Sequence, residues 1–159
     1  MRLVLGSIAA AVIICAPSDA ADRHSWNKIH YVGGTVPIQT SPFDFDTSLT
    51  IIASPAAVVL RISPAKLFAP EQTVRIQSSQ VISLSCGPAA WRLVAEVNGA
   101  QLPAKPHSLF GLGEYASYLG IVYEGDDGKR RGILLDSLFV WQIVPALAKL
   151  TGKPVERWP

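Results

Sequence analysis

Cysteine is scarce in this chain of 159 residues, which contains only Cys15 and Cys86. Cys15 lies inside an apolar amino-terminal segment that we expect to be removed, so Cys86 would be the single cysteine of the mature protein. One cysteine excludes an internal disulfide. The stability of the fold must therefore come from the burial of apolar side chains.

Charge of either sign is also sparse. The chain has 14 lysine and arginine residues and 12 aspartate and glutamate residues, for a net charge of +2 at neutral pH. A balance this even lacks the basic footprint of a nucleic-acid-binding protein, so we expect no nucleic-acid partner. Hydrophobic residues make up 49% of the chain, which indicates a globular domain with a core and not a disordered polymer.

Motifs of metal and nucleophile chemistry are missing as well. The three histidines are His24, His30 and His107, and no pair of them has the spacing of metal ligands. The chain has no Gly-x-Ser-x-Gly elbow and no phosphate-binding glycine loop. Cys86 could meet His30 or His107 in the fold and form a nucleophile pair, but no local feature supports either pairing. We predict a protein without catalytic residues, metal or cofactor.

Residues 1–20 have the pattern of a secretory signal. Arg2 gives the positive start, the run from Leu3 to Ala16 is almost entirely apolar, and small residues follow up to Ala20. The apolar run is shorter than the ~20 residues of a membrane-spanning helix. We predict cleavage near Ala20 and a periplasmic or extracellular protein; an uncleaved anchor is the alternative.

The rest of the chain is long enough for one domain. We expect residues 21–27 to form a flexible tail and residues 28–155 to form a single globular domain.

Short alternating segments in the first half predict β-strands. We expect strands at 28–32, 35–39, 48–52, 57–62, 73–77 and 80–86. Gly33 and Gly34 would form a turn between the first two strands, and residues 53–56 would connect a hairpin. In the strand 57–62, the face formed by Val58, Leu60 and Ile62 would be buried.

Cys86 ends the last of these strands. Alternation places Ile82, Leu84 and Cys86 on one face of that strand, and Ser83 and Ser85 on the other. This pattern predicts that Cys86 is a small buried core side chain. A reactive thiol or an intermolecular disulfide is the alternative.

The last third of the chain predicts a hairpin followed by a helix. Strands at 119–124 and 129–135 would flank the turn Gly125-Asp-Asp-Gly128. The helix would begin with Ser137 as its N-cap and end at Gly152. Its apolar stripe comprises Val140, Ile143, Val144, Leu147 and Leu150.

Pro145 lies inside this predicted helix. It predicts a kink near Trp141, or a helix whose regular part begins only near Val144. Upstream, we expect a short helix over 88–97 and a long loop over 101–116, with Leu109 and Phe110 tucked under the loop.

Lys129, Arg130 and Arg131 form the only basic cluster, and we name them as candidate ligand-binding residues. They could receive an anionic lipid headgroup or an acidic partner. Because Asp126 and Asp127 lie beside them, the cluster also fits the solvated edge of a hairpin.

Acidic and aromatic groups suggest two further sites. Asp44 and Asp46 could hold a cation, although short acidic side chains also suit loops by bonding nearby backbone amides. The same alternatives apply to Glu124, Asp126 and Asp127. A further group consists of aromatic and apolar side chains: Phe110, Tyr115, Tyr118, Leu138 and Trp141. If they are exposed, they suggest a contact with a protein or a membrane. The alternative is that they are buried in the domain.

The order of elements resembles small bacterial pleckstrin-homology-like domains. The resemblance rests on successive strands with short turns, then Ile121-Val-Tyr-Glu-Gly-Asp-Asp-Gly128, Gly132-Ile-Leu-Leu135 and one amphipathic helix, over residues 48–152. It implies two sheets in a partly open barrel plugged by the helix, in a binding or scaffolding module. Phosphoinositide binders of this family carry basic residues around the first hairpin turn. Here that turn is Ala53-Ser-Pro-Ala56, so no inositol-lipid site is carried over.

Together these observations predict a mostly β (α+β) fold, an antiparallel β-sandwich or partly open barrel closed by one carboxy-terminal α-helix. We expect an exported, non-enzymatic binding or interaction module whose partner is a protein or a membrane surface. The alternatives are a small cell-envelope hydrolase or cation-dependent enzyme, which would use Asp44, Asp46 or Cys86, and a structural accessory protein of the envelope.

Overall fold

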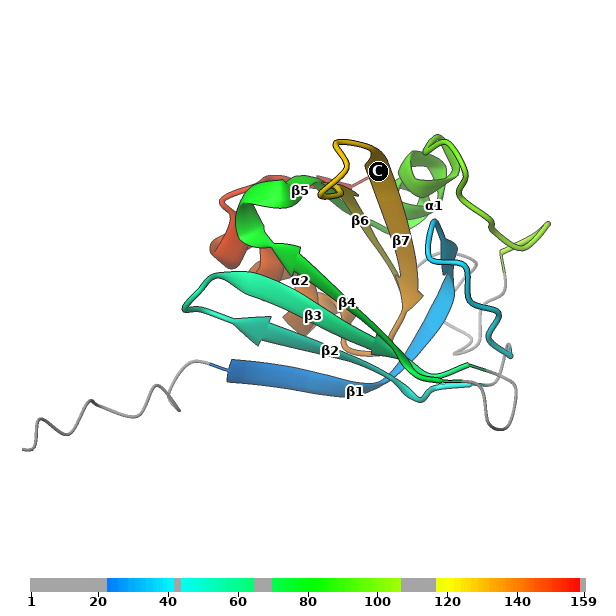
Figure 1. Ribbon diagram of the computed structural model, residues 1–159, viewed down its shortest axis with the longest axis horizontal. Helices are drawn as coiled ribbons and strands as arrows, with labels where there is room; N and C mark the ends of the chain where they lie inside the picture. Colours follow the sequence, from blue (N-terminus) through cyan, green and yellow to red (C-terminus); the bar gives the residue numbers. More distant parts are fainter. Residues whose placement is uncertain (1–22, 42–43, 65–69, 107–116, 158–159) are drawn as a thin grey trace, which may run out of the picture.

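The computed structural model describes residues 23–41, 44–64, 70–106 and 117–157 (Figure 1). These residues form a mostly β fold, as the sequence predicts, with eight strands, two α-helices and one turn of 3-10 helix. The elements in chain order are β1 (Arg23–Gly34), β2 (Thr47–Ile52), β3 (Ala57–Ile62), β4 (Gln72–Gln77), η1 (Ser78–Gln80), β5 (Val81–Cys86), α1 (Pro88–Ala95), β6 (Tyr118–Glu124), β7 (Arg130–Asp136), α2 (Val140–Thr151) and β8 (Val155–Arg157).

All eight strands belong to one sheet with the order β4-β3-β2-β1-β7-β6-β5-β8. Neighbouring strands are antiparallel except for β5 and β8, which are parallel. Within the described residues β4 and β8 do not pair with each other, so the sheet is not closed. Among the described strands, β4 therefore pairs along one edge only, with β3.

β1 joins the two halves of the sheet. Its first part pairs with β2, from Arg23 opposite Ile52 to Ile29 opposite Thr47, and its last part pairs with β7. The register shifts twice along β1, and at the first shift, between Trp26 and Ile29, Lys28 has a left-handed backbone with φ of 60°. Such irregularities bend a strand and increase its twist. Figure 1 shows β1 bending where it passes from one half to the other.

The prediction of a tail at 21–27 is wrong for Arg23 to Asn27, which form the start of β1. Pairing with β2 satisfies backbone groups there that a tail would leave to water. The predicted strand at 35–39 is also wrong, because the strand ends at Gly34. Gly33 and Gly34 continue β1 instead of turning.

The strands β2, β3 and β4 agree closely with the sequence prediction. Val58, Leu60 and Ile62 are fully buried, whereas Arg61 between them is exposed. In β5 the face assignment is wrong at Ile82, because a register shift between Val81 and Ser83 puts Val81 into the core with Leu84. Cys86 is half-buried and packs against that core.

α1 packs closely against β6 because the residues at their contact are small. Its first residue is Pro88, which suits a first helical turn, and Ala90 and Val94 are buried against Tyr118. A Cβ at Gly120 of β6 would lie 2.5 Å from Ser85 Oγ and 3.0 Å from Ala90 Cα. Glycine at this position is therefore required for the helix to approach the strand.

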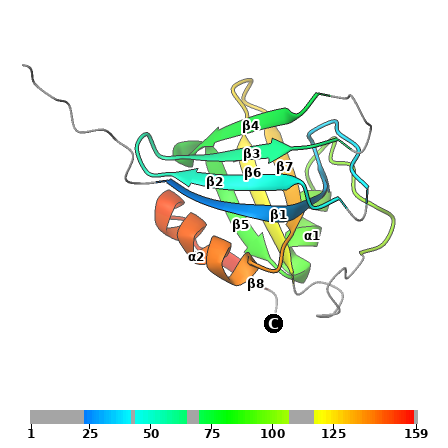
Figure 2. The same ribbon diagram turned by 90° about the horizontal axis from the view of Figure 1, so that it is seen from below.

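α2 covers the core on the side of the molecule away from β4 (Figure 2). Ile143, Val144 and Leu147 are buried as the stripe predicts, and each contributes about 1.5–3 kcal/mol by leaving water. Gly152 ends the helix in a left-handed conformation with φ of 68°. A further link comes from Trp26 of β1, whose indole N–H donates to Gln142 Oε1 at 3.2 Å.

The start of α2 differs from the prediction. The N-cap position is Phe139, and Ser137 lies two residues earlier, where its Oγ accepts a hydrogen bond from the Phe139 N–H at 3.1 Å. The α-helix begins at Val140, so the expectation that its regular part begins only near Val144 is wrong. Pro145 is accommodated because Ile143 and Leu147 on either side of it are anchored in the core. Across the described ranges, no helix has the length and apolarity needed to span a membrane.

Candidate functional site

The three predicted basic residues lie where the β6–β7 turn meets β7, and all three are exposed. Arg130 pairs with Glu124 across the hairpin, and Arg131 pairs with Tyr123. Of the three, only Arg131 lines the cavity between β4 and the β6–β7 hairpin. The structure therefore separates Arg131 from Lys129 and Arg130.

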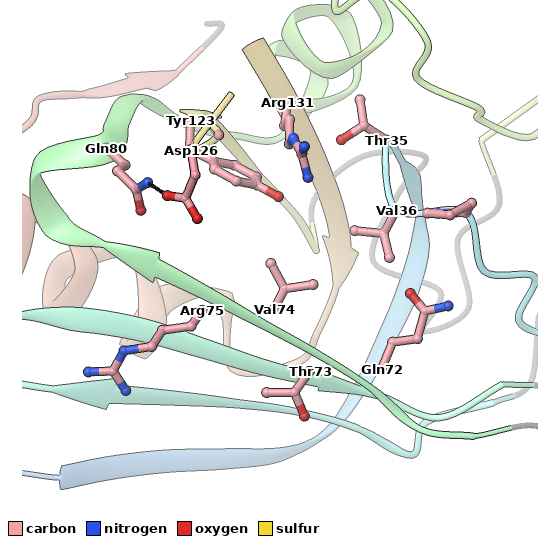
Figure 3. A pocket seen from close by; sticks show the side chains of 12 residues that line it. Thr35, Val36, Gln72, Thr73, Val74, Arg75, Gln80, Tyr123, Asp126 and Arg131 are labelled. Atoms are coloured by element: carbon pink, nitrogen blue, oxygen red, sulfur yellow. Dashed lines mark hydrogen bonds between the residues drawn. The ribbon is translucent and has the colours of Figure 1, made fainter. Parts of the chain in front are cut away.

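This cavity has a volume of about 270 Å³ and lies between β4 and the β6–β7 hairpin (Figure 3). Figure 3 shows Gln72 and Val74 pointing from β4 into it, while Thr73 and Arg75 point away. The lining is mainly polar, and its polar side chains that face inward come from four separate segments: Thr35, Gln72, Gln80, Tyr123, Asp126 and Arg131. The cavity offers hydrogen-bond donors and acceptors side by side.

Tyr123 and Arg131 form the hairpin wall of the cavity. Tyr123 is nearly buried, and this burial raises the pKa of its phenol, while the neighbouring Arg131 guanidinium opposes the rise. Tyr123 therefore keeps its proton near neutral pH and is a hydrogen-bond donor. Arg131 Nη2 also donates to Asp127 Oδ2 at 3.2 Å, between side chains that are almost half exposed.

Asp127 fixes the turn that carries Arg131. Its Oδ1 accepts a hydrogen bond from the Lys129 backbone N–H at 3.2 Å. That bond, followed by the contacts with Arg131, lowers the pKa of the Asp127 carboxyl. The turn therefore holds Arg131 at the mouth of the cavity through a charged acceptor.

Gln80 connects the other end of β4 to the same turn. Its Nε2 donates to Asp126 Oδ1 at 2.8 Å, and its Oε1 accepts the Gln77 backbone N–H at 2.8 Å. On a deeper wall, the Tyr31 hydroxyl donates to Val36 O at 3.1 Å, and burial raises the pKa of that phenol. These bonds fix the cavity walls in place.

The unpaired edge of β4 borders this cavity. The Ser78 N–H donates to Ala56 O at 2.9 Å, and hydrogen bonds alternate along an antiparallel pair. Val74 and Ile76 therefore bond to β3, whereas Thr73 and Arg75 direct their backbone N–H and C=O groups away from it. Among the described backbone bonds outside the strand ladders, none involves Thr73 or Arg75.

The acidic residues predicted as alternatives to this site act in turns. Asp44 Oδ1 accepts the Asp46 N–H at 3.1 Å, the loop role that short acidic side chains favour. No group of three or more potential ligand side chains that could hold a metal ion occurs in the described part of the chain.

The Cys86–His30 nucleophile pair is not supported either. Cys86 is a free cysteine on β5, and His30 is on β1, with β7 and β6 lying between these strands. His30 instead has its Nδ1 2.8 Å from Asp44 O. His107 lies outside the described residues.

One buried polar cluster was not predicted from the sequence. His30, Ser117 and Asp136 are all less than one-tenth exposed, and neither carboxylate oxygen of Asp136 has a hydrogen-bond partner of good geometry among the described residues. Burial raises the pKa of Asp136, while Ser117 and His30 favour its charged form more weakly. None of the three lines the cavity. Asp136 ends the run Gly132-Ile-Leu-Leu135, and its place at the end of this continuous buried run is the sequence signal for its burial.

The predicted apolar patch is divided between exposed and buried side chains. Trp141 is 69% exposed and Leu138 46% exposed, both near the start of α2. Tyr118 is buried, with its ring centroid 5.7 Å from that of Trp91. Phe110 and Tyr115 lie outside the described residues.

A scan against models of known protein families finds no match to this chain, and a search of curated proteins finds none either.

Proposed function

We propose that this protein is an exported, non-enzymatic binding module that accepts an extended polypeptide segment along the free edge of β4. The observation that carries this proposal is the position of that edge. Thr73 and Arg75 direct unpaired backbone groups toward the border of a polar cavity. An extended peptide adds to such an edge through main-chain hydrogen bonds, while pockets for alternate side chains give specificity.

The proposed architecture is a pleckstrin-homology-like, partly open barrel. Its support is the bent β1, which pairs with β2 in one half of the sheet and with β7 in the other. The core residues of α2 close one side, and the gap beside β4 leaves the other side open. In this architecture the gap beside β4 is the natural place for a partner.

The size of the cavity favours a peptide over a larger ligand. Pockets for drug-sized molecules usually measure about 300–1,000 Å³. A cavity of about 270 Å³ suits one or two side chains of a bound strand. Tyr123 and Arg131 would donate to such side chains, and Asp126 would accept from them.

The titratable groups of the cavity support a non-enzymatic role. A general base works best with a pKa near the operating pH. Burial moves the pKa of Tyr123 upward, away from neutrality, and Arg131 is held by Asp127. Among the described lining residues there is no histidine or cysteine.

Export rests on the predicted signal at residues 1–20. Cleavage near Ala20 would leave a mature chain that begins just before β1. Amino-terminal sequencing of protein recovered outside the cytoplasm tests this: a start near Ala21 supports export with cleavage, and an intact Met1 in the cytoplasmic fraction contradicts it.

The binding proposal is tested with a neutral peptide, acetyl-Thr-Gln-Val-Gln-Val-Gln-Thr-amide. We expect the protein to bind it with a Kd of about 1 mM or tighter, a weak affinity suited to backbone bonds alone. Thr73→Pro should abolish binding, because it removes an edge N–H that β3 does not use. The matched variant Thr73→Val keeps the N–H and should keep binding.

Circular dichroism and thermal melting would establish that both variants fold. Failure of the wild-type protein to bind the peptide, or equal binding by a folded Thr73→Pro variant, would overturn the proposal.

A further inference from the structure

The outer face of the β1–β4 half of the sheet carries three exposed arginines. Arg23, Arg61 and Arg75 come from β1, β3 and β4 and border a shallow hollow of about 540 Å³. The floor between them is made largely of hydroxyl and amide side chains, such as those of Ser25 and Thr50, whose oxygens are 2.8 Å apart. Arg75 borders both this hollow and the cavity, and its side chain points away from the cavity (Figure 3).

These arginines have no carboxylate partner among the described residues. The ion pairs in the described chain are made by Arg92 and Arg131 instead. An arginine face without counter-charges attracts anionic groups, and a guanidinium matches the geometry of a carboxylate.

We propose, on the basis of the binding function above, that the segment added to β4 is acidic, with aspartate or glutamate at alternate positions. A strand added at this edge extends the sheet, so every second side chain projects on the same face as Arg75. Cβ atoms of directly opposed residues lie about 4.5–5.5 Å apart across a strand pair. Carboxylates at alternate positions would therefore line up beside Arg75, within reach of Arg61 in the next strand.

The register supports this arrangement. Arg75 lies opposite Val59 in β3, and Arg61 lies opposite Thr73 in β4. These two cross-strand pairs are successive rows on the same face of the sheet, and each row contains one arginine. An acidic residue in each row of the added strand would meet one positive charge.

The same charges disfavour the other occupants. A second copy that paired through its own β4 would bring arginines together, and like charges across strands are destabilising. Membrane-surface binders combine basic with large apolar side chains. The exposed large apolar side chains of the described chain are Leu138, Phe139 and Trp141, which lie at α2 and not on this face.

Three acetylated and amidated heptapeptides test the inference. One has glutamate at alternate positions (Thr-Glu-Val-Glu-Val-Glu-Thr), one has glutamine there, and one has the same composition as the first with its glutamates consecutive. We expect the alternating acidic peptide to bind roughly tenfold more tightly than the glutamine peptide at low salt, through two exposed ion pairs. The advantage should shrink at 0.5 M NaCl.

Variants locate the effect. Arg75→Gln and Arg61→Gln should each reduce the advantage of the acidic peptide, whereas Arg157→Gln, on the far edge strand β8, should keep it. Equal affinity for the glutamate and glutamine peptides would overturn the acidic preference while leaving strand binding intact. Absence of binding to every peptide would overturn strand binding as well.

Three further results would also contradict the inference. If the consecutive-glutamate peptide binds as tightly as the alternating one, the face attracts charge without recognising a strand. If the protein binds phosphatidylglycerol vesicles through Arg61 and Arg75 but shows no preference for the acidic peptide, the face belongs to a membrane contact. The protein could instead dimerise as its concentration rises. If Arg75→Gln strengthens this dimer and the acidic peptide does not reverse it, the edge of β4 binds a second copy of the chain.

Discussion

His30 of β1 lies directly opposite Asp136 of β7, and both side chains are buried. Asp136 is fully buried, and burial raises the pKa of its carboxyl above the ordinary value near 3.9. The folded state therefore favours the protonated acid. The stability that this group contributes is present below the pKa of the unfolded chain, and it is lost as the pH rises through the folded-state pKa.

We predict that Asp136→Asn stabilises the protein at neutral pH by about 1 kcal/mol, since the amide cannot ionise. The difference should shrink toward zero below the unfolded-state pKa of about 3.9, where the wild-type carboxyl is protonated in both states. Thermal melting from pH 3.5 to 8 measures it, with Glu124→Gln, exposed on β6, as the control. A variant less stable than the wild type at pH 7 would show that an ion pair with His30 outweighs burial.

Gly34, at the end of β1 where it pairs with β7, is predicted to be intolerant of a side chain. Its φ of 144° is one that L residues rarely adopt, and a Cβ there would lie 2.1 Å from Gly132 O. Gly34→Ala should therefore cost about 2–4 kcal/mol of unfolding free energy. Urea denaturation measures this cost, and Gly128→Asn, at an open turn position with positive φ, should cost much less. If Gly34→Ala and Gly128→Asn cost the same unfolding free energy, the close approach of Gly34 to Gly132 is contradicted.

α2 should be held by its buried stripe and not by its exposed residues. Leu147 is fully buried in the core, so Leu147→Ala should cost about 2–5 kcal/mol. Trp141 is 69% exposed on the same helix, and Trp141→Ala should change stability by less than about 0.5 kcal/mol. A large loss for Trp141→Ala would place that side chain in a packed contact.

Local pattern was enough to predict β3 and α2. Alternation in Val58, Leu60 and Ile62 and helical spacing in Ile143, Val144 and Leu147 are set by residues close in the chain, and the structure buries all six. The same local patterns gave wrong strand bounds and wrong buried faces where the neighbouring strand determines them. β1 extends back to Arg23 because β2 supplies its partner, and the bulge in β5 replaces Ile82 with Val81 in the core.

The sequence pointed to two residues of the cavity: Arg131, through its basic neighbours, and Asp126, through the acidic group at the turn. Tyr123, Gln80 and Gln72 have no distinguishing pattern in the sequence. Their convergence depends on the gap between β4 and the hairpin, which follows from the order of strands in the sheet. The meeting of His30 and Asp136 was equally invisible, because it depends on the register between strands far apart in the chain.

The measurement that tests the central claim most directly is residue-specific amide hydrogen exchange of β4, with and without the neutral heptapeptide. In the free protein, the Thr73 and Arg75 amides should exchange rapidly, while those of Val74 and Ile76 are protected by β3. The peptide should slow exchange at Thr73 and Arg75 selectively. If these two amides are already protected in the free protein, or gain no protection when the peptide is in excess, β4 does not offer a free edge and strand binding at this site is contradicted.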